Sequence, residues 1–306
     1  MTAKAGLFVL LGAVGAAFLA FWIVFERRRA AGTSADDAGK RGGLLARIGI
    51  GVLTDFLDTL GVGSFATTTS LYKLGRTVDD EDIPGTLNVG HALPTVAQAF
   101  IYIKIVEVEM ATLIAMIVAS VAGAYLGAGI VARWPRRKIQ LGMGLLLLVA
   151  AMIIAFRQLA LVPGGGDALG ISGGKLAIGL GANFFLGALM TLGIGMYAPC
   201  MILVSLLGMN ATTAFPIMMG SCAFLMPIAG LRFIRTGRYN LRAAVGLTVG
   251  GVPAVLVAAF IVEALPLRVV QWLVVAVVVY TAAAMLRSAR THAVGRGETV
   301  KGGTHG

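Results

Sequence analysis

The stretch Thr59-Leu60-Gly61-Val62-Gly63 recurs 132 positions later as Thr191-Leu192-Gly193-Ile194-Gly195. Each copy interrupts an otherwise apolar segment, residues 48–75 and residues 176–208. Paired glycines favour a break between two helical arms, because glycine adopts turn conformations that other residues avoid. The arms of the first segment, about 12 or 13 residues each, would be ~18–20 Å long, against ~30 Å for a hydrocarbon core. We therefore predict two re-entrant helical hairpins whose turns are buried in protein.

The composition is that of an integral membrane protein. The chain has 306 residues, of which 58% are hydrophobic and only 13% are charged, and its mean hydropathy is +0.89. These values exclude soluble, disordered and disulfide-stapled classes, which lack long apolar runs. Seven further apolar runs are long enough to cross a bilayer: residues 5–25, 84–105, 109–132, 139–156, 212–231, 243–263 and 269–286.

Other parts of the chain repeat with the glycine pairs. Pro84 corresponds to Pro216, and the Pro-x-Arg-x-x-Gln pattern that begins at Pro135 returns 131 positions later at Pro266. Each repeat then holds one hairpin and three spans, and this odd number of crossings inverts the second copy. The predicted fold is all-α, with two inverted repeats and one extra N-terminal transmembrane helix. Its predicted divisions are an N-terminal helix with a basic loop (1–43), repeat 1 (44–158), a Gly-rich external linker (159–174), repeat 2 (175–288) and a cytoplasmic tail (289–306).

The net charge of +11 reflects topology in this reading. With re-entrant hairpins and an external N-terminus, 20 of the 25 Lys and Arg residues lie on one side, which the positive-inside rule assigns to the cytoplasm. The C-terminus is then cytoplasmic. Two full spans per broken segment would give the same orientation, so that version stays open for the longer second segment. The charge distribution argues against nucleic acid as a partner.

The glycine turns also predict where a substrate binds. Each turn precedes a helical arm whose free N–H groups and positive dipole end attract anions. Hydroxyl groups follow the first turn, although Ser and Thr in membrane helices often bond their own backbone instead. The predicted substrate-binding residues are Gly61, Gly63, Ser64, Thr67, Thr68, Asn88, Gly193, Gly195, Tyr197 and Cys200.

Two acids lie inside an apolar segment. Asp55 and Asp58 are three residues apart and therefore share one helix face, which must meet a cavity or a polar partner. They serve either a proton-linked or gating role or a structural hydrogen-bonding role, and His91 is either a proton partner or a hydrogen-bonded core histidine. Cys200 and Cys222 are interpreted as small buried hydrophobes, so we predict no disulfide, metal or other cofactor.

Several motifs together resemble the sulfite exporter TauE/SafE family, also called the four-toluene-sulfonate-uptake permeases. The resemblance covers residues 44–288 and implies a bacterial inner-membrane permease for sulfite, thiosulfate or small organosulfonates, commonly working as an exporter. The extra N-terminal span and the acids Asp55 and Asp58 depart from the family pattern. The motifs are Asp58-Thr59-Leu60-Gly61-Val62-Gly63-Ser64-Phe65-Ala66-Thr67-Thr68-Thr69, Pro84-Gly85-Thr86-Leu87-Asn88, and Gly123-Ala124-Tyr125-Leu126-Gly127-Ala128-Gly129 with Trp134-Pro135-Arg136-Arg137.

The combined expectation is a secondary transporter that binds a small anion between the two hairpins and works by alternating access, with protons as a candidate coupling ion. A passive anion channel is one alternative. A membrane-embedded enzyme or assembly factor is the other, and the chain has no His-x-x-x-His, Cys-x-x-Cys or Walker motif that would favour an enzyme.

Overall fold

The computed structural model describes residues 2–30, 43–79, 81–127 and 166–264, with scattered helical positions between 141 and 152 and between 272 and 287. Its described residues form helices and connecting turns, and the only β-pairing among them is a single bridge between Ala168 and Met209. The predicted all-helical class is therefore confirmed. Most of the predicted spans 139–156 and 269–286, and the tail 289–306, lie outside the described residues.

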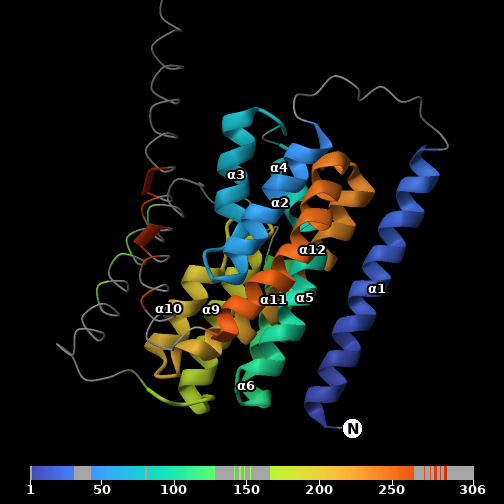
Figure 1. Ribbon diagram of the computed structural model, residues 1–306. Helices are drawn as coiled ribbons and strands as arrows, with labels where there is room; N and C mark the ends of the chain where they lie inside the picture. The colour runs from blue at the N-terminus through green and yellow to red at the C-terminus, as the bar shows by residue number, and fades with distance from the viewer. Residues whose placement is uncertain are drawn as a thin grey trace, which may run out of the picture.

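The helices are shown in Figure 1. They are α1 (Ala3–Ala30), α2 (Leu44–Thr59), α3 (Ser64–Gly75), α4 (Ile83–Gly90), α5 (Ala92–Ile105), α6 (Met110–Ala122) with the π-helical turn η1 (Gly123–Gly127), α9 (Gly173–Met190), α10 (Tyr197–Leu206), the 3-10 turn η2 (Ala211–Thr213), α11 (Ala214–Thr236) and α12 (Leu241–Ala264).

Four of the described helices are long and apolar enough to cross a membrane: Ala3–Arg29, Gly173–Met190, Ala211–Thr236 and Leu241–Ile261. Three of them coincide with predicted spans. The fourth, α9, is the first arm of the second glycine-broken segment, and its 18 residues give roughly 27 Å of helix. This arm therefore reaches much farther than the arms expected from the first segment.

The predicted span 84–105 consists of two helices in succession, α4 and α5. The chain breaks at His91, between α4 and α5. Pro94 explains the break, because proline has no N–H to bond the carbonyl of Gly90 four residues earlier. That carbonyl instead accepts a hydrogen bond of 2.7 Å from the Thr248 hydroxyl of α12.

Both predicted glycine breaks are present. Between α2 and α3, Gly61 and Gly63 have φ of +91° and +85°, a region that other residues rarely adopt. Between α9 and α10, Gly193 has φ of +80°. The first arm, α2, has 16 residues and is longer than predicted because it begins at Leu44.

The two hairpins meet at their turns. A Cβ placed on Gly63 would lie 3.8 Å from the Cβ of Tyr197, and one placed on Gly195 would lie 3.6 Å from the Cβ of Phe65. Phe65 and Tyr197 are separated by the same 132 positions as the two glycines. The two contacts are therefore reciprocal. In Figure 1, α2 and α3 occupy the upper part of the molecule and α9 and α10 the lower part.

Helix α11 forms the centre of the structure and α1 its edge. In the most apolar 18-residue stretch of each helix, 89% of the residues are buried in α11 and 28% in α1. The first arm of each hairpin packs closely on a neighbouring helix, α2 on α12 and α9 on α6. Glycines permit this, because a Cβ on Gly250 would collide with the carbonyl of Ile48 and one on Gly187 with the carbonyl of Ser120.

Helix α1 contacts two other helices along its length. Phe8 stacks on Phe100 of α5 with ring centroids 5.5 Å apart, and Phe18 lies against Gly230 of α11. Near its end, the Trp22 indole N–H donates to the Tyr239 hydroxyl at 2.9 Å. The extra N-terminal helix is thus docked on the body of the protein by both apolar and polar contacts.

Candidate functional site

A buried chain of hydrogen bonds begins at Asp55, near the end of α2. The Asp55 Oδ1 atom lies 2.8 Å from the Nδ1 atom of His91, and the His91 Nε2 atom lies 3.1 Å from the Thr68 hydroxyl of α3. All three side chains are fully buried. When Nδ1 donates to Asp55, Nε2 accepts from Thr68 in the neutral imidazole and donates to it in the imidazolium. This chain is therefore able to hold or pass a proton.

The helix break places His91 between the two arms of the first hairpin. From the junction of α4 and α5, the imidazole reaches Asp55 on α2 and Thr68 on α3. The ring also lies 6.1 Å from the ring of Phe65, at the beginning of α3. His91 is thus a fixed element that joins both arms, in addition to being a titratable group.

The second acid, Asp58, is 1% exposed and accepts hydrogen bonds from three different helices. Its Oδ1 atom accepts from the backbone N–H of Ser64, the first residue of α3. Its Oδ2 atom accepts from the Gln98 side chain of α5 at 2.9 Å and from the Tyr197 hydroxyl of α10 at 3.0 Å. The carboxylate therefore occupies the N-terminal end of α3, where the sequence predicted a bound anion.

Further bonds join the Asp58 cluster to the end of α2. The Gln98 amide N–H also donates to the Thr59 hydroxyl at 3.0 Å, and Thr59 donates to the Asp55 carbonyl at 2.8 Å. The Tyr102 hydroxyl donates to the Thr59 carbonyl at 2.5 Å. The Tyr102 bond thus satisfies the carbonyl of Thr59, which the glycine turn would otherwise leave open inside an apolar protein.

One carboxylate oxygen in this region has no hydrogen-bond partner within the described residues, namely Oδ2 of Asp55. It faces Gly251 of α12 and Pro94 of α5, and a Cβ on Gly251 would collide with it. Glycine at position 251 therefore makes room for the acid. A buried unpaired carboxylate oxygen is costly, which is typical of functional sites rather than of structural cores.

The predicted site residues divide into two groups. Ser64, Thr68 and Tyr197 join the acids and His91, whereas Thr67 donates to the carbonyl of its own helix neighbour Ser64 at 2.8 Å. The remaining predicted residues do not hydrogen-bond to the cluster among the described contacts. The Asn88 amide donates to the Pro84 carbonyl at 2.8 Å, Cys200 is buried in α10, Gly61 and Gly193 pack against Phe215 and Pro84, and Gly63 and Gly195 face Tyr197 and Phe65.

The sequence reasoning missed Gln98, Thr59 and Tyr102. A signal for two of them was present, because the polar residues of the segment 84–105 are spaced at helical intervals. His91, Thr95, Gln98 and Tyr102 follow one another after four, three and four residues, and this spacing places them on one helix face. A polar face on an otherwise apolar helix predicts a buried polar partner.

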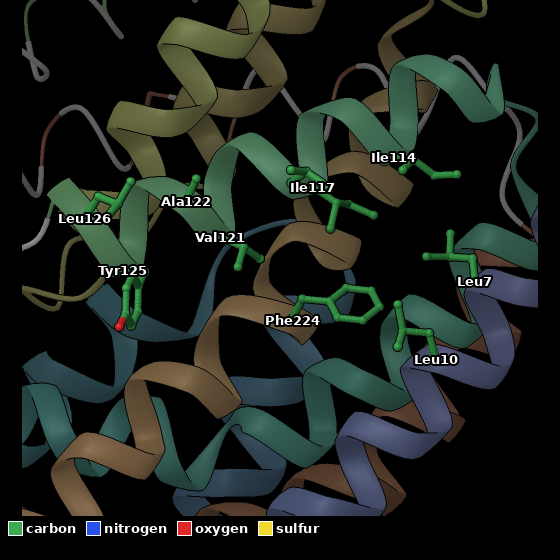
Figure 2. Close-up of a pocket in the computed structure, with 10 residues that line it drawn as sticks. Leu7, Leu10, Ile114, Ile117, Val121, Ala122, Tyr125, Leu126 and Phe224 are labelled. Atoms are coloured by element: carbon green, nitrogen blue, oxygen red, sulfur yellow. The ribbon is translucent and has the colours of Figure 1, made fainter.

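A separate groove lies between α1, α6 and α11, with a volume of about 450 Å³ (Figure 2). Its walls are apolar and include Leu7, Leu10, Ile114, Val121, Tyr125 and Phe224. An anion in this groove would lose its hydration without gaining hydrogen-bond donors. The polar cluster at the hairpin turns is therefore the better candidate for a site that recognises a charged substrate.

Among the described residues, no group of three His, Cys, Asp or Glu side chains is arranged to hold a metal ion, and Cys200 and Cys222 are both buried and free. No protein-family model, curated protein or solved structure matches this chain. Its function is therefore inferred from its own residues.

Proposed function

We propose that this chain is a secondary transporter that carries small anions across a membrane by alternating access. The observation that carries the proposal is the fully buried polar cluster at the point where two glycine-broken hairpins meet. Broken helices that meet in an apolar protein are the arrangement in which transporters place their substrate sites. Resemblance to the TauE/SafE family adds the substrate class, which is sulfite, thiosulfate or small organosulfonates.

Reciprocal contacts support an inverted-repeat plan. Under the offset of 132, α9 corresponds to α2, and α12 corresponds to α6 with η1. The packing of α2 on α12 is thus matched by the packing of α9 on α6. The matched pair of contacts between Gly63 and Tyr197 and between Gly195 and Phe65 supports the same relation.

The predicted orientation is supported by contacts among the basic loops. Arg29, at the end of α1, lies beside Gly237, which follows α11. Arg238 forms an exposed ion pair of 2.8 Å with Glu81, just before α4. Arg29 and Arg238, from two of the basic segments, therefore lie at one end of the described part of the molecule, which agrees with the predicted topology. We place this end in the cytoplasm of a bacterial cell, with the N-terminus outside the inner membrane.

Protons are the proposed coupling ion. The chain from Asp55 through His91 to Thr68 offers two titratable groups in direct contact, and it lies one helical turn from Ser64 at the proposed anion site. A proton bound to this chain would alter the charge next to the anion site, and a change of buried charge is a strong way to bias one conformation over another.

Reconstitution into liposomes tests the transport proposal. We expect saturable flux of labelled sulfite, thiosulfate or a small sulfonate that exceeds the flux of protein-free liposomes. Tyr197→Phe should lower this flux, because it removes a donor at the proposed site. Ser70→Ala is the matched control, since its hydroxyl donates to its own helix at Ala66 and is exposed. Absence of saturable flux for every small anion would refute the proposal, and unsaturable flux at channel rates would select the passive channel instead.

A further inference from the structure

The environment of Asp58 has the properties of an oxyanion site. Its three hydrogen-bond donors are all neutral: a backbone N–H from Ser64, an amide from Gln98 and a hydroxyl from Tyr197. They belong to α3, α5 and α10, and the Gln98 and Ser64 side chains are buried together with Tyr197. Donors from three separate elements converge here on a single carboxylate, a stronger indication than one helix N-terminus would give.

Only a short chain segment, the glycine turn, separates Asp58 from the first residue of α3. Asp58 lies in the last turn of α2, and six positions later Ser64 begins α3, so the acid folds back across the glycine turn. Gly61 and Gly63, both with positive φ, allow the chain to reverse tightly enough for this contact. Movement of the turn would therefore move the carboxylate relative to the donors of α5 and α10.

We propose that the three donors form the anion-binding site itself and that the Asp58 carboxylate is a built-in stand-in, which a free oxyanion replaces when the turn moves. This inference rests on the proposed transport function and adds the identity and regulation of the site. A carboxylate, a sulfite and a sulfonate each present at least two acceptor oxygens on one atom, so all three suit the same donors.

The stand-in accounts for how a buried anion site remains stable without substrate. Without Asp58, the Ser64 N–H would be buried with no acceptor, which proteins strongly avoid. The Gln98 amide and the Tyr197 hydroxyl would keep only their second acceptors, the Thr59 hydroxyl and the Gln98 carbonyl oxygen. With Asp58 in place, all three donors have an acceptor and the two hairpins are held together through Tyr197. Substrate therefore competes with an internal ligand at the donors.

Chemical rescue of an Asp58→Ala variant tests the proposal. The variant is purified in detergent, and its melting temperature is measured with increasing sodium formate or sulfite at constant ionic strength set with sodium chloride. We expect the variant to melt several degrees below the wild type, and formate to restore much of this loss in a saturable manner. The wild type should respond much less, because its own carboxylate occupies the donors. Adding Gln98→Leu to the variant should weaken the rescue.

If added formate or sulfite raised the melting temperatures of the wild type and of Asp58→Ala equally, the proposal would be overturned, because the salt would then stabilise the protein in general. If Asp58→Ala cannot be purified, Asp58→Asn provides the test, since it keeps an acceptor for Ser64 but removes the competing charge. We then expect added anion to raise the melting temperature of Asp58→Asn by more than it raises that of the wild type. An equal or smaller rise in the variant would overturn the proposal. If formate restores the melting temperature of Asp58→Ala but the wild type shows no anion flux in liposomes, only the transport proposal is refuted. If the wild type shows flux but no anion restores the melting temperature of the variant, only the stand-in role of Asp58 is refuted.

Discussion

The imidazole of His91 lies 2.8 Å from the carboxylate of Asp55, and both side chains are completely buried. This contact joins the end of the first hairpin arm to a break in the following helix. The same ring contacts Thr68 of the second arm at 3.1 Å. Three segments that meet at the centre of the protein are therefore linked by one titratable side chain.

Replacement of Asp55 should uncouple transport from protons. In liposomes, we expect Asp55→Asn to keep measurable anion flux but to lose most of its dependence on an imposed pH gradient, because the amide cannot ionise beside His91. Flux is measured with and without the gradient. Glu81→Gln is the control, since Glu81 is an exposed acid that pairs with Arg238. An Asp55→Asn protein whose flux still follows the gradient as the wild type does would contradict proton coupling through this acid.

Loss of the imidazole should destabilise the protein. In His91→Ala, the Asp55 Oδ1 atom loses its partner while Oδ2 already has none among the described residues, so the buried carboxylate is left without hydrogen bonds. We expect a loss of about 1–3 kcal/mol in the free energy of unfolding. Thermal unfolding in detergent measures it. Thr67→Ala is the control and should change stability by less than about 0.5 kcal/mol, because Thr67 bonds only its own backbone.

The two glycines of the second turn should respond differently to substitution. Gly193 has φ of +80°, whereas Gly195 is not among the residues with positive φ. Gly193→Ala should therefore cost about 1–2 kcal/mol of strain. Gly195→Ala should cost much less, since its Cβ would meet Phe65 at an ordinary 3.6 Å. Parallel melting curves compare them, and an equal loss in both variants would show that backbone conformation is not the cause.

The contact between α1 and the loop after α11 should weaken in alkali. Burial and the hydrogen bond to Glu26 raise the pKa of Tyr239 well above its usual value. The folded protein then keeps the phenol proton at pH values where the unfolded chain, with a pKa of about 10, loses it. Stability from this group is therefore present below pH ~10 and falls as the pH rises further. Tyr239→Phe should unfold with a flatter pH dependence than the wild type between pH 9 and 11 in detergent, and identical slopes would contradict this assignment.

The main breaks in the fold could be predicted from glycine pairs, because their conformational effect is local. The break at His91 could not be predicted with the same certainty. Proline at position 94 removes one hydrogen bond, but the freed carbonyl of Gly90 is satisfied by Thr248, which is 158 residues away. A partner so far away in sequence is set by tertiary packing. The sequence near His91 therefore shows the proline but not the hydroxyl that satisfies the freed carbonyl.

The candidate site shows the same division. Two acids on one face predicted a polar partner, and helix starts after glycine turns predicted a place for an anion. The sequence did not show that Asp58 itself fills that place, because this depends on a bond back to Ser64 and on Gln98 and Tyr197 arriving from other helices. Gln98 stands on a polar helix face that the sequence spacing indicates, but this spacing does not identify Asp58 as its acceptor.

The docking of α1 has a consequence for motion. Its first half lies against α5 through Phe8 and Phe100, and its second half holds the segment before α12 through Trp22 and Tyr239. The proposed repeats are thus bridged by a helix that belongs to neither of them. In the proposed alternating access, rocking of one repeat against the other would have to break or shift these contacts, so α1 would limit how far the two halves open.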